Sequence, residues 1–160
     1  MTICNLTVLK ARLTNEERLL GLDFGTKRIG LAISDPTRRI ALPLDTLRRS
    51  RLSSDVTYLA NIAHSWAVGG FIIGFPFHMN GQESQSVHHV RRFATDLIDH
   101  THLFDEEPDI VFWDERWSTV VVTRMLRQVR LKRSQQAKMV DRLAATYILQ
   151  GALDALCVVD

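Results

Sequence analysis

The chain has 160 residues, of which 46% are hydrophobic and 24% charged, and its formal net charge is +2. This length suits one domain with a substantial core and leaves no room for a second domain of ordinary size. No apolar run is long enough to span a bilayer, and Cys4 and Cys157 lack the spacing of metal ligands. We therefore expect a cytoplasmic protein without a membrane span. A sequence pI near 8.7 permits nucleic-acid binding without demanding it.

The amino-terminal residues lack the long apolar region and small-residue cleavage site of a secretory signal. We expect residues 1–18 to form a disordered or loosely attached extension, and residues 19–157 to form a single domain.

The segment that opens this domain has the sequence LLGLDFGTKRIGLAISD and predicts a β-hairpin. Its first apolar run is typical of a strand buried on both faces, but Asp23 interrupts it. Burying a lone carboxylate costs several kcal/mol, so Asp23 requires a metal, a cation or a position at the strand end. The glycine and short polar residues that follow suit a tight turn, which carries Lys27 and Arg28. A simpler alternative is that Asp23 only caps this turn or pairs with one of the two cations.

Residues 40–47 predict a third strand, joined to the hairpin by a short turn, so the chain opens with an antiparallel meander. A helix follows, which we expect Ser53 or Ser54 to cap and the pair Gly69-Gly70 to stop.

Strands and helices alternate in the second half of the chain. Short apolar runs at residues 71–74 and 109–113 are typical of buried parallel strands. Helical spacing of apolar residues predicts helices at about residues 83–100, at about 118–130, and from about 134–138 to about 156. Together these segments predict an α/β fold: a mixed five-stranded sheet, first an antiparallel meander and then parallel strands, with helices on both faces.

Further carboxylates lie where such a sheet binds ligands. Asp114 and Glu115 directly follow the run at residues 109–113, at the carboxyl end of a predicted parallel strand. Neighbouring strand residues point to opposite faces, so only one of the pair is expected to lie beside Asp23. Asp141 precedes a stripe of small residues on the last helix, which predicts that it packs near the sheet. An acid that merely stabilises the first turn of that helix explains Asp141 equally well.

Three carboxylates from separate elements repel one another unless a cation lies among them. Mg²⁺ and Mn²⁺ prefer such oxygen ligands and bind substrate phosphates as well. Ions held in this way activate an attacking water and stabilise the leaving oxygen in phosphodiester cleavage. The acids therefore predict metal-dependent hydrolysis of a nucleic-acid backbone.

Four motifs, in order along the chain, are GLDFGTKRIGLAISD, IIGFPFHMNG, WDERWST and KMVDRLAATYILQGALD. They resemble the YqgF/RuvX family of Holliday junction resolvases, also described as pre-16S rRNA nucleases. The resemblance covers nearly the whole chain from about residue 19 and implies an RNase H-like fold, related to the resolvase RuvC. It implies a cytoplasmic bacterial nuclease that matures the 5′ end of the small-subunit ribosomal RNA precursor. It also implies that Asp23, Glu115 and Asp141 form the acidic triad and hold Mg²⁺ or Mn²⁺, with Asp114 the less favoured alternative to Glu115.

Substrate contacts are expected beside these acids. Asn80 and Gly81 lie in a loop after a predicted strand and can present bare backbone N–H groups, although an ordinary turn is an equal explanation. The basic residues that flank the acids in sequence are candidates to hold phosphates: Lys27, Arg28, Arg116 and Lys138.

The leading prediction is an endonuclease that acts on structured RNA, in ribosomal precursor particles. A DNase that resolves branched DNA is the alternative within the same chemistry; it would act as a dimer, and we expect a monomer or a weak homodimer here. The DFGT motif also resembles the first phosphate motif of actin-like and sugar-kinase ATPases, but those proteins need two such domains. A non-catalytic RNA-binding or transcription-associated module would keep the acids for structure alone.

Overall fold

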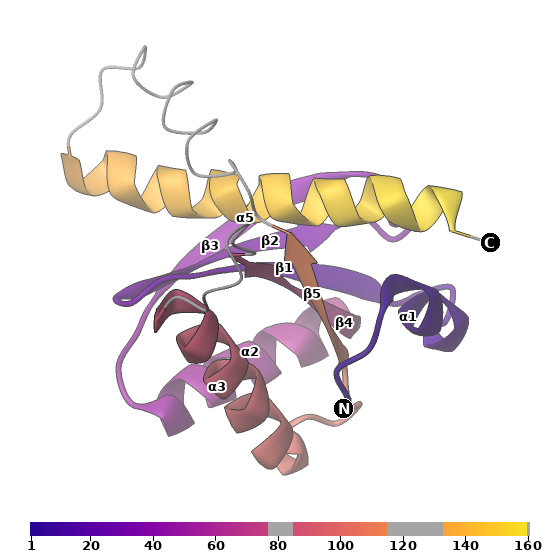
Figure 1. The fold of residues 1–160 in the computed structure, drawn as a ribbon, viewed down its shortest axis with the longest axis horizontal. Helices are drawn as coiled ribbons and strands as arrows, with labels where there is room; N and C mark the ends of the chain where they lie inside the picture. Colours follow the sequence, from indigo (N-terminus) through magenta and orange to yellow (C-terminus); the bar gives the residue numbers. More distant parts are fainter. Residues whose placement is uncertain (77–84, 115–132, 160) are drawn as a thin grey trace.

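Figure 1 shows a computed structural model of the chain, which describes residues 1–76, 85–114 and 133–159. The strands are β1 (Arg18–Phe24), β2 (Arg28–Ser34), β3 (Ala41–Arg48), β4 (Val68–Phe75) and β5 (Asp109–Asp114). The helices are α1 (Leu6–Arg12), α2 (Leu52–Trp66), α3 (Gln85–Asp99), the short 3-10 helix η1 (Thr101–Leu103) and α5 (Arg133–Val158).

The strands form one mixed sheet in the order β3-β2-β1-β4-β5. β2 runs antiparallel to both β1 and β3, whereas β4 runs parallel to both β1 and β5. The predicted sheet, a meander followed by parallel strands, is confirmed. Because β1, β4 and β5 are parallel, their carboxyl ends lie at the same edge of the sheet.

Helices cover both faces of the sheet, as predicted: α5 lies along one face, and α2 and α3 lie along the other (Figure 1). Alternate residues of β1 divide the core between these faces. Leu20 and Leu22 pack in the cluster under α2 and α3, whereas Leu19 packs with Leu149 and Leu153 of α5. All three β1 leucines are fully buried, which explains why this strand forms an almost continuous apolar run.

The amino-terminal segment is folded onto the domain, so the predicted loose attachment of residues 1–18 is wrong. Ile3 forms a parallel bridge with Ile110 of the edge strand β5. The Asn5 side chain caps α1, and Leu9 of this helix is 1% exposed in the core cluster under α5. A helix of seven residues with one buried side chain has no amphipathic pattern to reveal it in the sequence.

A partly buried ion pair also holds this segment. Arg12 donates a hydrogen bond of 2.8 Å from Nη1 to Oδ2 of Asp109, and Thr2 donates to the same carboxylate. Burial acts to raise the pKa of Asp109, but these hydrogen bonds outweigh it and the pKa is lowered. The first residues of the chain therefore belong to the fold.

The predicted boundaries of α2 are wrong at both ends. The helix begins after its N-cap Arg51, and Ser53 and Ser54 lie inside it. It ends at Trp66, and its C-cap Ala67 has a left-handed φ of 51°. Gly69-Gly70 does not stop the helix but lies within β4.

The other helices follow the expected order. α3 lies within the predicted range, and α5 begins slightly earlier and ends slightly later than predicted, at Arg133 and Val158. The helix predicted at residues 118–130 lies outside the described residues. In the described part of the chain, no helix has the length and apolar character to cross a membrane.

Candidate active site

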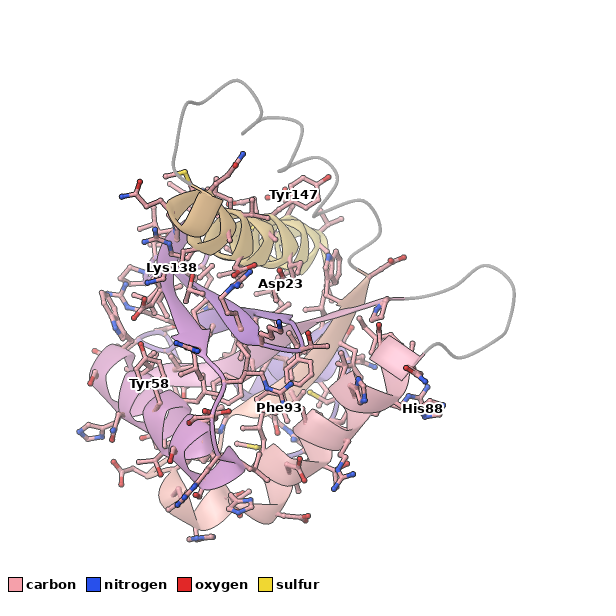
Figure 2. The ribbon with its side chains drawn as sticks, turned by 90° about the vertical axis from the view of Figure 1, so that its left-hand side faces the viewer. Asp23, Tyr58, His88, Phe93, Lys138 and Tyr147 are labelled. Atoms are coloured by element: carbon pink, nitrogen blue, oxygen red, sulfur yellow. The ribbon has the colours of Figure 1, made fainter. Side chains whose placement is uncertain are left out.

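Asp23 lies at the carboxyl end of β1, on the face of the sheet that α5 covers (Figure 2). Gly21, two residues earlier on the same face, touches α5 directly: a Cβ there would lie 2.7 Å from Cβ of Leu149. The Asp23 side chain is partly exposed at this edge. The strand-end position expected for a carboxylate in an apolar run is therefore observed.

Asp141 of α5 lies over the same part of the sheet. Gly30 of β2 is the cross-strand partner of Asp23, and residues directly opposite each other share a face. A Cβ built on Gly30 would lie 2.0 Å from the carbonyl oxygen of Asp141 and 3.1 Å from its Cα. Asp23 thus lies beside Gly30 and the backbone of Asp141 lies over it, on one face of the sheet. The alternative that Asp141 is a first-turn acid is wrong, because α5 begins at Arg133.

Arg28 is the cation that the structure pairs with Asp141. Its Nε donates a hydrogen bond of 2.5 Å to Oδ2 of the carboxylate, and the two side chains are 39% and 19% exposed. Arg28 lies two residues before Gly30 in β2 and therefore on the same face. Arg28, which the sequence predicts to hold a phosphate, instead pairs with the predicted metal ligand Asp141. Residue spacing alone does not reveal this pairing.

The acid at the end of β5 has a different orientation. Trp113 lies against α5, because a Cβ on Gly151 would lie 2.9 Å from its Nε1, and the neighbouring Phe112 packs in the core on the other side. Asp114 pairs in register with Phe75, which belongs to that same core under α2 and α3. Alternation therefore directs Asp114 away from the face of Asp23. Glu115 lies outside the described residues.

The remaining predicted contacts divide into two groups. Lys27 is exposed in the turn between β1 and β2, at the edge where Asp23 lies. Lys138 is exposed on α5 close before Asp141, and its carbonyl oxygen accepts a hydrogen bond of 3.0 Å from Oγ1 of Thr46. Three predicted contacts lie outside the described residues: Asn80, Gly81 and Arg116.

Of the three predicted ligands, Asp23 and Asp141 lie next to Gly30 on the same face of the sheet. Across residues 1–76, 85–114 and 133–159, no group of three acidic, histidine or cysteine side chains is placed to hold a metal. Asp23 and Asp141 supply hard oxygen donors at a partly exposed edge, with Arg28 as a neighbouring positive charge. This arrangement suits a divalent cation and a phosphate ligand better than a soft metal.

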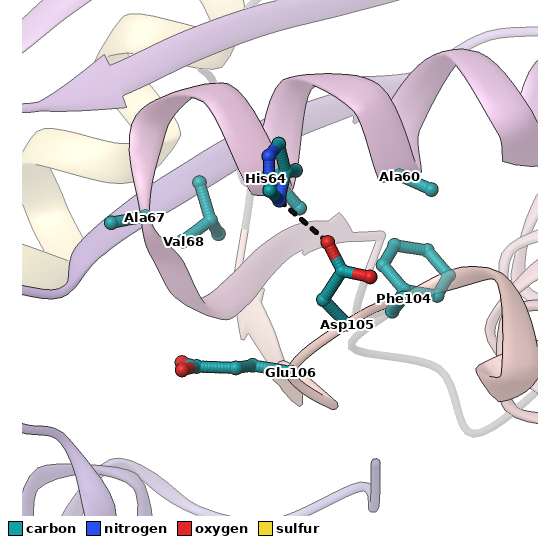
Figure 3. A pocket seen from close by; sticks show the side chains of 8 residues that line it. Ala60, His64, Ala67, Val68, Phe104, Asp105 and Glu106 are labelled. Carbon is teal, nitrogen blue, oxygen red and sulfur yellow. Dashed lines mark ion pairs between the residues drawn. The ribbon is translucent and has the colours of Figure 1, made fainter.

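A separate hollow of about 230 Å³ lies between α2, the start of β4 and the residues after η1 (Figure 3). Val68 in its lining pairs in register with Arg18, at the opposite end of β1 from Asp23. The lining of the hollow includes Ala60, Ala63 and Phe104, together with an ion pair of 2.5 Å between His64 and Asp105. Its position separates it from the candidate active site.

Comparison with known proteins places nearly the whole chain in one family. Residues 17–155 match the RuvX family, described as Holliday junction resolvase. A relative from Rhodospirillum centenum, named "Putative pre-16S rRNA nuclease", is 44% identical over 156 residues, which are 98% of this chain and 83% of that protein. A relative of the same name from Paramagnetospirillum magneticum is 45% identical over 146 residues, 91% of each chain.

Solved structures show the same fold at low identity. Thermus thermophilus RuvC superposes with a TM-score of 0.55 at 13% identity, covering 89% of this chain and 97% of RuvC. The yeast mitochondrial Holliday junction resolvase Ydc2 gives 0.52 at 10% identity, covering 95% of this chain and 84% of Ydc2. The fold is thus the RNase H-like fold of the resolvases, as predicted. By the match of its sequence along nearly its full length, the chain belongs to the RuvX family.

Proposed function

We propose that this protein is a metal-dependent endonuclease that hydrolyses phosphodiester bonds of nucleic acid, with Asp23, Glu115 and Asp141 as its catalytic acids. The observation that carries the proposal is that Asp23 lies beside Gly30 in the β1–β2 ladder while the backbone of Asp141 lies over Gly30 on the same face of the sheet. Membership of a family described as resolvases, with relatives named as rRNA nucleases, supports hydrolysis of a phosphodiester bond.

Mg²⁺ or Mn²⁺ fits the donors at this edge, because both carboxylates offer hard oxygen atoms and remain accessible to water. Asp23, Glu115 and Asp141 would hold the ion. When bound, the ion supplies a Lewis acid that activates the attacking water and stabilises the leaving oxygen. Arg28 neutralises the charge of Asp141 in this structure, and with a cation held by Asp141 it would be free to contact a substrate phosphate.

Glu115 is proposed as the third acid in preference to Asp114, because Asp114 points toward α2 and α3. Around the acids, the proposed phosphate contacts are Lys27, Arg28, Asn80, Gly81, Arg116 and Lys138. Lys27 and Lys138 lie on different elements beside the site, which supports contacts on both sides of the scissile bond.

For the substrate, we propose structured RNA at the 5′ end of pre-16S rRNA, in ribosomal precursor particles in the cytoplasm. The names of the curated relatives support this choice. A four-way DNA junction is the second candidate, which the description of the family favours. A monomer or weak homodimer is sufficient for cleavage of one RNA strand, whereas symmetric cleavage of a junction requires a dimer.

The test compares cleavage of a pre-16S rRNA fragment and of a four-way DNA junction with Mg²⁺. Wild-type protein is expected to cleave the RNA, and Asp23→Asn is expected to lose at least about a hundredfold in rate, because an amide is a weaker ligand for a hard cation. Asp154→Asn is the matched control, since Asp154 is an exposed acid farther along α5.

The outcomes separate the proposals. Loss of cleavage in Asp23→Asn with full activity in Asp154→Asn supports the active site. Wild-type rates in Asp23→Asn contradict it. Faster cleavage of the junction than of the RNA would identify branched DNA, and not RNA, as the substrate.

A further inference from the structure

A second surface lies at the same end of the sheet as Asp23, on the opposite face. It is an open hollow of about 280 Å³, several times the roughly 30 Å³ that one water molecule occupies. We name it the hairpin groove, because the turn after β1 and the helix α3 form its walls. Its lining residues are Phe24, Thr26, Arg49, His89, Arg92, Phe93 and Asp96.

The groove begins one residue from the candidate active site. Phe24 follows Asp23 in β1, and neighbouring strand residues point to opposite faces. Phe24 stacks on Phe93 of α3 with ring centroids 4.6 Å apart, which joins the turn to the helix. In Figure 2 the labelled Asp23 lies on the α5 side of the hairpin, and Phe93 lies on the α3 side. A nucleic-acid strand that crosses the tip of the hairpin therefore passes from one site to the other.

Arg49 is held in place at the wall of the groove. Its Nη1 donates hydrogen bonds of 3.2 Å to the carbonyl oxygens of Gly25 and Thr26, and its guanidinium carbon lies 4.5 Å from the ring centroid of Phe24. Its Nε is buried and has no hydrogen-bond partner among the described residues. Neutral carbonyl groups and an aromatic ring fix this side chain without cancelling its charge.

The charges of the groove favour an anion. Arg92 and His89 project from one side of α3, and neither Arg49 nor Arg92 forms an ion pair within the part of the chain that the structure describes. Asp96 is the one carboxylate among the lining residues, one turn of α3 beyond Arg92. Two arginines against one acid leave the lining positive, and a guanidinium binds phosphate oxygens through paired hydrogen bonds.

We propose that the hairpin groove binds a backbone phosphate of the nucleic-acid strand, at a position flanking the scissile phosphate, with Arg49 and Arg92 as its cationic contacts. This inference rests on the proposed nuclease function and extends it to a second binding site. Asp96 limits the affinity of the groove through repulsion. The contact is to phosphate, so it does not distinguish RNA from DNA or one sequence from another.

The test measures binding rather than cleavage. A fluorescent single-stranded RNA and a DNA of the same sequence, each of about 20 nucleotides to exceed the site size of one small domain, are titrated with full-length protein in EDTA, and anisotropy gives Kd at several salt concentrations. Arg92→Gln is expected to weaken binding of both strands on the order of tenfold at low salt, and to reduce the slope of log K against log salt by about 0.7. Asp96→Asn is expected to tighten binding.

Arg39→Gln is the matched control, since Arg39 is exposed in the turn after β2, at the other end of the sheet. Equal Kd values and equal salt slopes for Arg92→Gln and Arg39→Gln would overturn the proposal that the groove binds phosphate. Weaker binding by Asp96→Asn would overturn it as well. Loss of cleavage in Asp23→Asn would still support the nuclease in that case. If Arg92→Gln weakens binding but wild-type protein cleaves no substrate, the groove stands and the nuclease proposal falls.

Discussion

Gly30 lies directly opposite Asp23 in the β1–β2 ladder, and the backbone of Asp141 occupies the space where a side chain on Gly30 would be. The distance from the added Cβ to the Asp141 carbonyl oxygen would be 2.0 Å, far inside van der Waals contact. The missing side chain at Gly30 therefore sets how closely α5 approaches the strand that carries Asp23. The geometry of the two acids depends on this residue, which has no functional group of its own.

Substitution of Gly30 by alanine is expected to push α5 away from the sheet. Overpacking of this kind costs about 1–3 kcal/mol, so the free energy of unfolding in urea should fall by that amount. The cleavage rate should fall by more than the loss of folded protein explains, because Asp141 moves with the helix. Gly69→Ala is the control: its added Cβ meets the side-chain ends of Glu17 and Leu13, which can move aside. Equal activity of the two variants would contradict a positioning role for Gly30.

Removal of the Arg28 charge is expected to change metal binding. Arg28 pairs with Asp141, the carboxylate that we propose as a metal ligand, so we expect its guanidinium to compete with a divalent cation. Partly exposed ion pairs contribute up to about 1 kcal/mol, so Arg28→Gln should tighten Mn²⁺ binding by about fivefold in calorimetry. Cleavage should nevertheless decrease if Arg28 also contacts the substrate. Weaker Mn²⁺ binding in Arg28→Gln than in wild type would show that Arg28 supports the site rather than competing for it.

The amino-terminal helix is expected to contribute to global stability. Leu9 is 1% exposed, whereas the preceding residue, Val8, is 36% exposed. Leu9→Ala should lower the free energy of unfolding by about 2–4 kcal/mol, because it opens a cavity in the core under α5. Val8→Ala should change it by less than about 0.5 kcal/mol. If Leu9→Ala and Val8→Ala both change the free energy of unfolding only slightly in chemical denaturation, the segment is a loose extension after all.

Tyr58 predicts a pH dependence at alkaline pH. Burial, together with the hydrogen bond of 2.6 Å that Tyr58 donates to Asp45, raises its pKa to about 12. Because the unfolded pKa is about 10, the contribution of this contact is present below pH 10 and is lost as the pH rises through about 12. In a Tyr147→Phe background, absorbance of the remaining tyrosine at alkaline pH should follow this value. Asp45→Asn should lower the midpoint, and an unchanged midpoint would exclude the contact as the cause.

The sheet could be predicted because its physical causes are local. Strands covered on both faces form apolar runs, as at residues 71–74 and 109–113, and the structure places β4 and β5 there. Asp23 stands out in the sequence because it interrupts such an apolar run. The turn glycine and the short polar residues after it likewise indicated the hairpin.

The end of α2, the pairing of Arg28 and the hairpin groove depend on contacts between residues that are far apart in the sequence, so the sequence alone does not predict them. Gly69-Gly70 predicts a helix stop, but both residues lie in β4, and the side chains of Leu9 and Leu19 occupy the space that a Gly70 side chain would need. The pairing of Arg28 with Asp141 joins residues 113 positions apart, and no spacing rule predicts it. The hairpin groove likewise combines Arg49, the residue directly after β3, with one side of α3. In the sequence, only the charges of its residues mark this groove, and charged residues more often belong to an ordinary solvated surface.

The central claim is that Asp23 and Asp141 hold one divalent ion between them. A crystal of the wild-type protein soaked in Mn²⁺, with data collected at the manganese absorption edge, tests it most directly. The account predicts an anomalous peak whose ligands include carboxylate oxygens of both residues, and loss of that peak in Asp23→Asn. Manganese bound at a site that neither carboxylate reaches, in a protein that still cleaves its substrate, would contradict the account.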